Sequence, residues 1–219
     1  HDEESFSETI GRGTLLAQED KLVVFGIPPN DSNTAYGYIK TGEPLVDAFT
    51  VDSFTEKPSR ETAKKFLSEG SYLWNTGIFL FRASMFLSLV ESYEPNLLKH
   101  VRLSFEDAKK NKPYLVLDSK TFSRCKSISI DYAIMEKANN AVVVPATFKW
   151  SDLGSWDALP KISGQDSEGN SVSGNIFMKD TSNSIIRSES RLVAALGIKN
   201  TVIIDTSDAL LVSSKEHSQ

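Results

Sequence analysis

The first part of the chain alternates between short apolar runs and longer stretches whose apolar residues have helical spacing. Residues 21–27 (KLVVFGI) predict a buried strand, which is closed by Pro28 and Pro29. Residues 48–54 alternate between apolar and polar side chains and predict a second strand. Further strands are predicted at residues 36–40, 78–81 and 141–148. Strands that alternate with helices are typical of an α/β sheet covered by helices.

Helices are predicted between these strands. We expect Ser59 to cap one helix and Gly70 to end it. Ser84 is predicted to cap the next helix, which ends near Pro95. Further helical patterns occupy residues 5–18, 97–105 and 129–137, while the polar residues 109–126 predict a variable excursion.

The pattern changes near residue 162. Residues 164–174 form a linker rich in Gly, Ser, Asp and Asn, and beyond it we expect only short strands. We therefore predict two parts, an α/β domain at residues 1–162 and a small all-β annex at residues 163–219. Short edge strands invite pairing with another chain, so the annex is a candidate surface for a homodimer.

Composition argues against several classes of function. The net charge of -5 gives no electrostatic footprint for nucleic acid. Apolar runs such as residues 78–81 are too short to span a membrane, and the start of the chain shows no signal-peptide pattern. The single cysteine, Cys125, excludes an internal disulfide, and with three scattered histidines it makes no zinc spacing. These features predict a cytoplasmic protein.

Glu56 and Lys57 come directly after the strand predicted at residues 48–54. A carboxylate can accept hydrogen bonds from two neighbouring sugar hydroxyls, and an ammonium group can meet a phosphate as a point charge. Taken alone, the pair is more typical of a solvated turn at which Pro58 ends the strand. Ligands of open α/β sheets lie at the carboxyl ends of strands, which favours the binding interpretation.

Two further segments offer contacts for a sugar. Asn75, in the sequence Asn75-Thr76-Gly77, precedes an apolar run and carries both a donor and an acceptor. Gly37, between Tyr36 and Tyr38, would let a ligand approach the backbone closely. An ordinary turn explains the first segment and a β-bulge glycine the second, so both alternatives stay open.

Two aspartates complete the candidates. Asp152 lies in a loop between Trp150 and Trp156, and its carboxylate could hold Mg²⁺ beside a phosphate or simply cap a turn. Asp131 is either a sugar contact or a first-turn residue favoured by the helix dipole. The chain contains no Gly-rich phosphate loop, GxSxG or HExxH motif.

Six segments, taken together and in this order, resemble the bacterial mannose-1-phosphate guanylyltransferases. They are LVVFGIPP at 22–29, YGYI at 36–39, FTEKP at 54–58, WNTGIF at 74–79, SIDYAIME at 129–136 and WSDLGSW at 150–156. Each segment is weakly specific, but their order is a strong signal, and the last two favour the mannose branch among sugar-nucleotide pyrophosphorylases. The resemblance covers essentially the whole chain and implies part of a Rossmann-like nucleotidyltransferase mixed sheet, followed by the β annex.

The resemblance also implies an activity. GTP and mannose-1-phosphate would give GDP-mannose and pyrophosphate, with Mg²⁺ as the cofactor. Glu56 would bind mannose hydroxyls, Lys57 the sugar's phosphate, and Asn75 and the Gly37 backbone the sugar ring. Asp131 would lie near the sugar. Asp152 would be a metal-binding carboxylate and, with Lys57, would take part in catalysis.

The family's opening glycine-rich nucleotide loop and its Asp-His metal pair have no counterpart in this sequence. The resemblance therefore implies the sugar-binding half of a nucleotidyltransferase, which we expect to be inactive alone and to expose a sheet edge. Alternatives are a pyrophosphorylase for another sugar or nucleotide, and a non-catalytic sugar-phosphate-binding or dimerisation protein.

Overall fold

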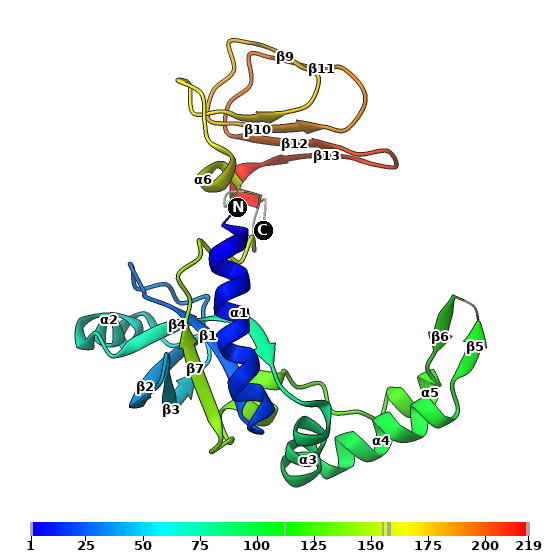
Figure 1. Cartoon of the computed structure of the whole chain (residues 1–219). Helices are drawn as coiled ribbons and strands as arrows, with labels where there is room; N and C mark the ends of the chain where they lie inside the picture. The colour runs from blue at the N-terminus through cyan, green and yellow to red at the C-terminus, as the bar shows by residue number, and fades with distance from the viewer. Residues whose placement is uncertain (1, 112, 155, 157–158, 218–219) are drawn as a thin grey trace. The chain divides into compact units, whose positions relative to one another are not determined.

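The computed structural model describes residues 2–111, 113–154, 156 and 159–217 of the chain. The chain divides into two compact units, His1–Trp150 and Ser151–Gln219, and each is described by itself. The first unit has an α/β fold with a mixed sheet, and the second is built mainly from short β-strands. Figure 1 labels most of the elements of both units. The domain boundary expected near residue 162 stays a prediction.

The first unit begins with one long helix and then alternates strands and helices. Its elements are α1 (Glu3–Gln18), β1 (Leu22–Ile27), β2 (Tyr38–Leu45), β3 (Ala48–Thr55), α2 (Arg60–Glu69), β4 (Tyr72–Leu80), α3 (Ala83–Tyr93), α4 (Pro95–Glu106), β5 (Lys109–Asn111), β6 (Tyr114–Val116), α5 (Ser119–Phe122), the π-helix η1 (Asp131–Met135) and β7 (Ala141–Pro145).

Five of these strands pair in a closed ring, in the order β1-β4-β2-β3-β7. β1 runs parallel to β7 and antiparallel to β4, which makes the sheet mixed. Within the described residues each of the five strands has a neighbour on both sides. The exposed sheet edge expected from the sequence is therefore absent from this part of the chain, because β7 pairs with both β1 and β3.

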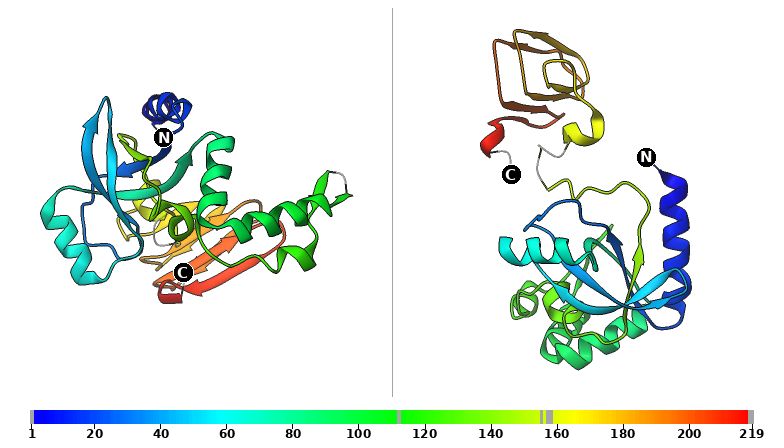
Figure 2. Two further views of the ribbon diagram at one scale, coloured as in Figure 1. Left: turned by 90° about the horizontal axis from the view of Figure 1, so that it is seen from below. Right: turned by 90° about the vertical axis from the view of Figure 1, so that its left-hand side faces the viewer.

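β1 is covered on both faces, as its unbroken apolar sequence requires. Val23 and Phe25 pack with Ala17 of α1 and with alternate residues of β7. Leu22 and Val24 point the other way, into a cluster built with α3, α4 and η1. Figure 2 shows α1 and the α3–α4 pair on different sides of the strands.

Local signals in the sequence explain several helix ends. The Ser59 hydroxyl accepts a hydrogen bond from the Thr62 N–H at 3.2 Å, as predicted for an N-cap. Gly70 ends α2 in the left-handed conformation. The predicted cap at Ser84 is wrong, because α3 begins at Ala83 and its N-cap residue, Arg82, makes no side-chain cap. Pro95 opens α4, since the first position of a helix needs no N–H donor.

The excursion at residues 109–126 has regular structure. β5 and β6 form an antiparallel hairpin, and α5 follows it. The hydroxyl of Ser104, which is fully buried, donates to the Asp118 carbonyl at 3.0 Å. The Asp118 N–H donates back to the Ser104 carbonyl at 3.1 Å. These two bonds close the base of the hairpin loop.

The second unit stacks short strands in two sheets. Its elements are α6 (Leu159–Ser163), β8 (Ser171–Ser173), β9 (Ile176–Lys179), β10 (Ile185–Ser188), β11 (Val193–Leu196), β12 (Thr201–Asp205), β13 (Leu210–Ser214) and the 3₁₀ turn η3 (Lys215–His217). One sheet has the order β13-β12-β10-β8, and the other pairs β11 with β9. All pairs are parallel except β12 with β13.

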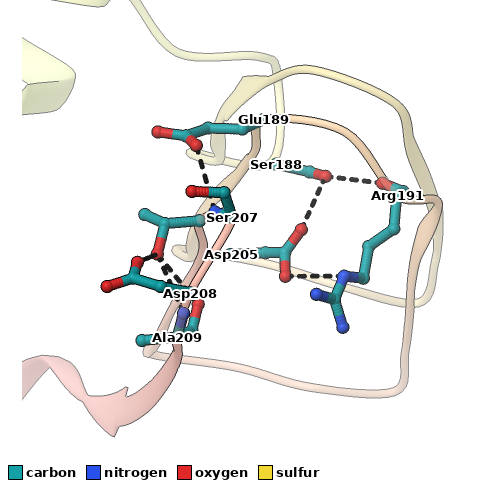
Figure 3. A network of polar contacts seen from close by, with 8 residues as sticks. Ser188, Glu189, Arg191, Asp205, Ser207, Asp208 and Ala209 are labelled. Carbon is teal, nitrogen blue, oxygen red and sulfur yellow. Dashed lines mark hydrogen bonds and ion pairs between the residues drawn. The ribbon is translucent and has the colours of Figure 1, made fainter.

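The corners between these strands depend on left-handed residues and on buried polar contacts. Asp180, Asn183 and Asn200 have φ of 53°, 46° and 51°, a conformation that Asn and Asp tolerate better than most residues. At another corner, Figure 3 shows the buried Asp205 carboxylate between Ser188 and Arg191. Such corners let the strands stack as successive coils.

In the part of the chain that the structure describes, no helix is long and apolar enough to cross a membrane.

Candidate functional site

Strand register brings three of the predicted site residues into one row. Tyr38 of β2 pairs with Thr55 of β3 and with Trp74 of β4. The next residues towards that end of the sheet are Gly37, Glu56 and Asn75. Because β2 is antiparallel to both neighbours, its first residues meet the carboxyl end of β3 and the middle of β4.

Close contacts hold this row together. The Asn75 N–H donates to the Gly37 carbonyl at 2.8 Å. A β-carbon built on Gly37 would lie 2.7 Å from Glu56 Oε2 and 3.4 Å from Asn75 Cβ. Gly37 therefore leaves room for the Glu56 carboxylate against the backbone, and any larger residue would fill that room.

Asp131 joins the row from another part of the chain. It is the first residue of η1, whose following residues Ala133, Ile134 and Met135 are buried and anchor the turn. The Asn75 Nδ2 donates to Asp131 Oδ1 at 3.5 Å. The structure thus places Gly37, Glu56, Asn75 and Asp131 side by side, although Gly37 and Asp131 are 94 positions apart in the sequence.

Two of these residues, Glu56 and Asp131, border an open pocket of about 640 Å³, a volume in the range of small-molecule sites. We call it the Glu56 pocket. Its lining residues are Glu56, Lys57, Ser127, Ile128, Ser129, Asp131 and Tyr132. The pocket contains three of the residues predicted from the sequence.

Burial and neighbouring charges perturb the Glu56 carboxyl group. Its side chain is 14% exposed. Burial raises the pKa of Glu56 above its ordinary value of 4.5, and the negative charges of Asp131 and Glu136 add to this, while Lys57 opposes it. Carboxyl groups whose pKa is shifted by burial and by specific charged neighbours are concentrated at functional sites.

Lys57 supplies the positive charge of the pocket. Its Nζ lies 3.8 Å from Glu56 Oε1, and its side chain is 63% exposed. Its backbone has a φ of 47°, a left-handed conformation that is unfavourable for lysine. Strained backbone of this kind is concentrated at functional sites, where the side chain must point in a particular direction.

Taken together, these groups suit a small polyhydroxylated anion. The carboxylates of Glu56 and Asp131 can accept hydrogen bonds from hydroxyl groups, and the Asn75 amide can donate one. The exposed ammonium group of Lys57 can pair with a phosphate oxygen.

Asp152, the predicted metal ligand, lies in the second unit and is exposed. A β-carbon on Gly154 would lie 2.5 Å from its Oδ2, so Gly154 leaves room for this carboxylate. Among the described residues, no three His, Cys, Asp or Glu side chains are grouped so that they could hold a metal ion. A Mg²⁺ ion often takes only one or two carboxylates and completes its shell with phosphates and water. Asp152 fits that limited role.

The sequence prediction missed part of the pocket and misplaced Asn75. Ser127 and Ile128 line the pocket but fall between the polar excursion at 109–126 and the helix predicted at 129–137, where no local pattern distinguishes them. Ser129 and Tyr132 belong to the SIDYAIME segment and could have been chosen with Asp131. Asn75 was expected to precede a strand, but it lies inside β4.

Two family models match the chain. The family model for nucleotidyl transferases matches residues 3–169. The chain belongs to the nucleotidyl transferase family. A second model, described as a mannose-phosphate isomerase/GMP-like β-helix domain, matches residues 174–219.

Individual relatives of this nucleotidyl transferase chain carry related names. It is 40% identical over 218 residues to a mannose-1-phosphate guanylyltransferase of Klebsiella pneumoniae and 41% identical over 220 residues to one of Salmonella montevideo. These matches cover 98% and 97% of this chain but only 46% of each relative, so the chain spans about half their length.

A solved structure is also similar. The crystal structure named mannose-1-phosphate geranyltransferase, from Thermus thermophilus, superimposes with a TM-score of 0.78 at 29% identity. The match covers 98% of this chain and 62% of that chain. It supports both the α/β fold and the β-strand part that follows it.

Proposed function

We propose that this chain carries the sugar-phosphate site of a mannose-1-phosphate guanylyltransferase. The observation that supports the proposal most strongly is the row of Gly37, Glu56, Asn75 and Asp131 beside Lys57, in a chain whose relatives bear that name. Glu56 and Asp131 accept hydrogen bonds from mannose hydroxyls, and Lys57 pairs with the phosphate.

In the proposed reaction an oxygen of the mannose-1-phosphate attacks the α-phosphorus of GTP. A new phosphorus–oxygen bond forms, the bond to the β-phosphate bridge breaks, and pyrophosphate leaves. This chain's residues contribute by orienting the sugar phosphate and by offsetting its negative charge. Lys57 offsets the negative charge of the phosphate. The Glu56–Asp131 pair fixes the sugar so that its phosphate faces the nucleotide.

Mg²⁺ is part of the proposal. When bound, it would withdraw negative charge from the phosphate oxygens. Asp152 is the residue that would hold it, together with phosphates of the substrates. In the Asp152→Asn variant, Mg²⁺ should therefore no longer strengthen the binding of GDP-mannose. The affinity measured in EDTA should equal that of the wild type. An unchanged response to Mg²⁺ would remove Asp152 as a ligand. A cytoplasmic location and a homodimer stay predictions.

Calorimetric titration of the 219-residue chain tests the substrate. We expect mannose-1-phosphate and GDP-mannose to bind, and UDP-glucose to bind much more weakly. Glu56→Gln should weaken mannose-1-phosphate roughly 10- to 100-fold, since hydrogen bonds to charged groups contribute about 1.5–3 kcal/mol. Glu43→Gln, in β2 outside the Glu56 pocket, is the matched control and should bind like the wild type.

Three results would contradict the proposal. Tighter binding of UDP-glucose would indicate a pyrophosphorylase for another sugar and nucleotide. Unchanged affinity in Glu56→Gln would show that the sugar lies elsewhere. Failure of the wild-type chain to bind mannose-1-phosphate or GDP-mannose would show that the site is not contained in this chain.

A further inference from the structure

β4 contains a bulge next to the row of site residues. In its pairing with β1, Val24 lies opposite Phe79, whereas Gly26 lies opposite Asn75. Residues 76–78 of β4 therefore lie opposite a single residue of β1. Extra residues in a bulge lose ladder hydrogen bonds, so their backbone groups must find other partners.

The Thr76 side chain supplies those partners. Its hydroxyl donates to the Phe25 carbonyl of β1 at 2.9 Å. The same oxygen accepts from the Ile78 N–H at 3.3 Å. Thr76 is 7% exposed, so water cannot readily replace these bonds. One buried hydroxyl thus links the bulge to β1 and also links Thr76, at one end of the bulge, to Ile78 at the other.

The bulge also fixes the orientation of the Asn75 amide. Asn75 Oδ1 accepts from the Gly77 N–H at 3.1 Å. With its oxygen engaged in this way, the amide turns its Nδ2 towards Asp131 Oδ1, at 3.5 Å. Gly77 makes the turn possible because its φ of 73° is one that side chains rarely adopt.

We propose that Thr76 is a positioning residue for the sugar-phosphate site. Its hydroxyl holds the bulge in the shape that keeps the Asn75 amide donor aimed at Asp131, which lines the Glu56 pocket. Thr76 itself contacts no ligand, because its hydroxyl is engaged with β1 and with Ile78. The role rests on the function proposed above, and its structural basis can be tested without a ligand.

The binding test compares two substitutions that differ in the hydroxyl. Thr76→Val keeps the shape and removes both bonds, so we expect mannose-1-phosphate to bind roughly tenfold more weakly. Thr76→Ser keeps the hydroxyl and should bind within about threefold of the wild type. In an Asn75→Ala background, Thr76→Val should add little, because it acts through Asn75. The same loss in both backgrounds would overturn the proposal.

A ligand-free measurement separates this inference from the proposed function. The ¹H–¹⁵N signals of the Asn75 side-chain amide, assigned by their loss in Asn75→Ala, should shift or broaden in Thr76→Val and return in Thr76→Ser. Unchanged signals in folded Thr76→Val would overturn the positioning role, even if the wild-type chain bound no sugar phosphate.

Gly77→Ala strains the same bulge from an exposed position and provides a second variant if Thr76→Val fails to fold. An added β-carbon there meets nothing within 4 Å, so its effect comes from the positive φ alone. We expect the Asn75 amide signals to move in this variant and mannose-1-phosphate affinity to fall. Signals and affinity like those of the wild type would contradict the proposal.

Discussion

The Glu56 carboxylate lies where a side chain on Gly37 would have to be, since a β-carbon at residue 37 would come within 2.7 Å of Glu56 Oε2. Gly37 is not among the residues with positive φ, so its backbone conformation is open to alanine. The absence of a side chain at residue 37 therefore matters for space and not for backbone freedom.

Gly37→Ala should displace the Glu56 carboxylate and disturb the site more than the fold. Overpacking of this kind costs about 1–3 kcal/mol of stability, whereas each hydrogen bond that a displaced carboxylate no longer makes to a ligand costs about 1.5–3 kcal/mol of binding free energy. We expect mannose-1-phosphate affinity to fall roughly 10- to 100-fold, measured by calorimetry.

Gly11→Ala is the matched control for this variant. Gly11 lies in α1, and an added β-carbon there meets nothing within 4 Å. Alanine should raise the free energy of unfolding by about 0.5–1 kcal/mol and leave affinity unchanged. If Gly37→Ala bound as well as this control, the close fit of Gly37 and Glu56 would have no part in recognition.

Glu56→Gln should make the chain more stable at neutral pH while it weakens binding. The pKa of Glu56 is raised in the fold, first by burial and then by Asp131. The folded state therefore holds the proton more tightly than the unfolded state, and stability is lost as the pH rises from below 4.5 through the raised pKa. Glutamine has no ionisable proton, so the variant does not lose stability in this way as the pH rises.

Urea unfolding at a series of pH values checks this expectation. The difference in free energy of unfolding between Glu56→Gln and the wild type should be positive at pH 7 and shrink as the pH falls towards and below 4.5. A difference that stays constant across the series would show that the pKa of Glu56 is the same in the folded and unfolded states.

Lys57→Met should reduce the preference for a phosphorylated sugar over a neutral one. Methionine keeps most of the side-chain length and removes the charge, so mannose-1-phosphate should bind roughly tenfold more weakly while free mannose changes little. Competition binding with both ligands measures the ratio. Lys65→Met, an exposed lysine of α2 that pairs only loosely with Glu69, is the control. Equal losses for both sugars would place the phosphate elsewhere.

Arg191→Ala should destabilise the second unit because it leaves a buried carboxylate without its cation. Asp205 has no exposed side-chain surface, and Arg191 Nε lies 2.9 Å from its Oδ1. We expect a loss of about 1–3 kcal/mol, and a partial recovery when Asp205→Asn is added to remove the charge. Lys199→Ala is the control, because it removes an exposed cation from the same unit. Urea denaturation measures all three, and a double variant no more stable than Arg191→Ala would refute the explanation.

Much of the fold is predictable because it depends on local patterns. The apolar run at 22–27, the cap at Ser59 and the left-handed Gly70 each carry their own signal, and the structure confirms them. The α3 cap was wrong because a serine in a suitable place does not by itself decide where a helix starts. Residues 109–111 and 114–116 looked irregular because a three-residue strand is too short to show alternation.

The site was only partly predictable, since it depends on pairing between distant segments. The chemistry of Glu56, Asn75 and Asp131 can be proposed from their types, but their adjacency follows from register. Asn75 was expected before a strand because Gly77 interrupts the apolar pattern. In the structure β4 continues through Gly77, where it forms a bulge. The bulge can be recognised only from the pairing of β4 with β1.

The parallel pairing of β1 with β7 has a consequence for synthesis. β1 ends at Ile27, but its second neighbour begins only at Ala141, so residues 28–140 are made first. Until then β1, which is buried along most of its length, has one bare edge, where it can join a wrong chain. A nascent chain paused before Ala141 is therefore exposed to aggregation and suited to chaperone binding, whereas one that has released Pro145 can enclose that strand on both edges.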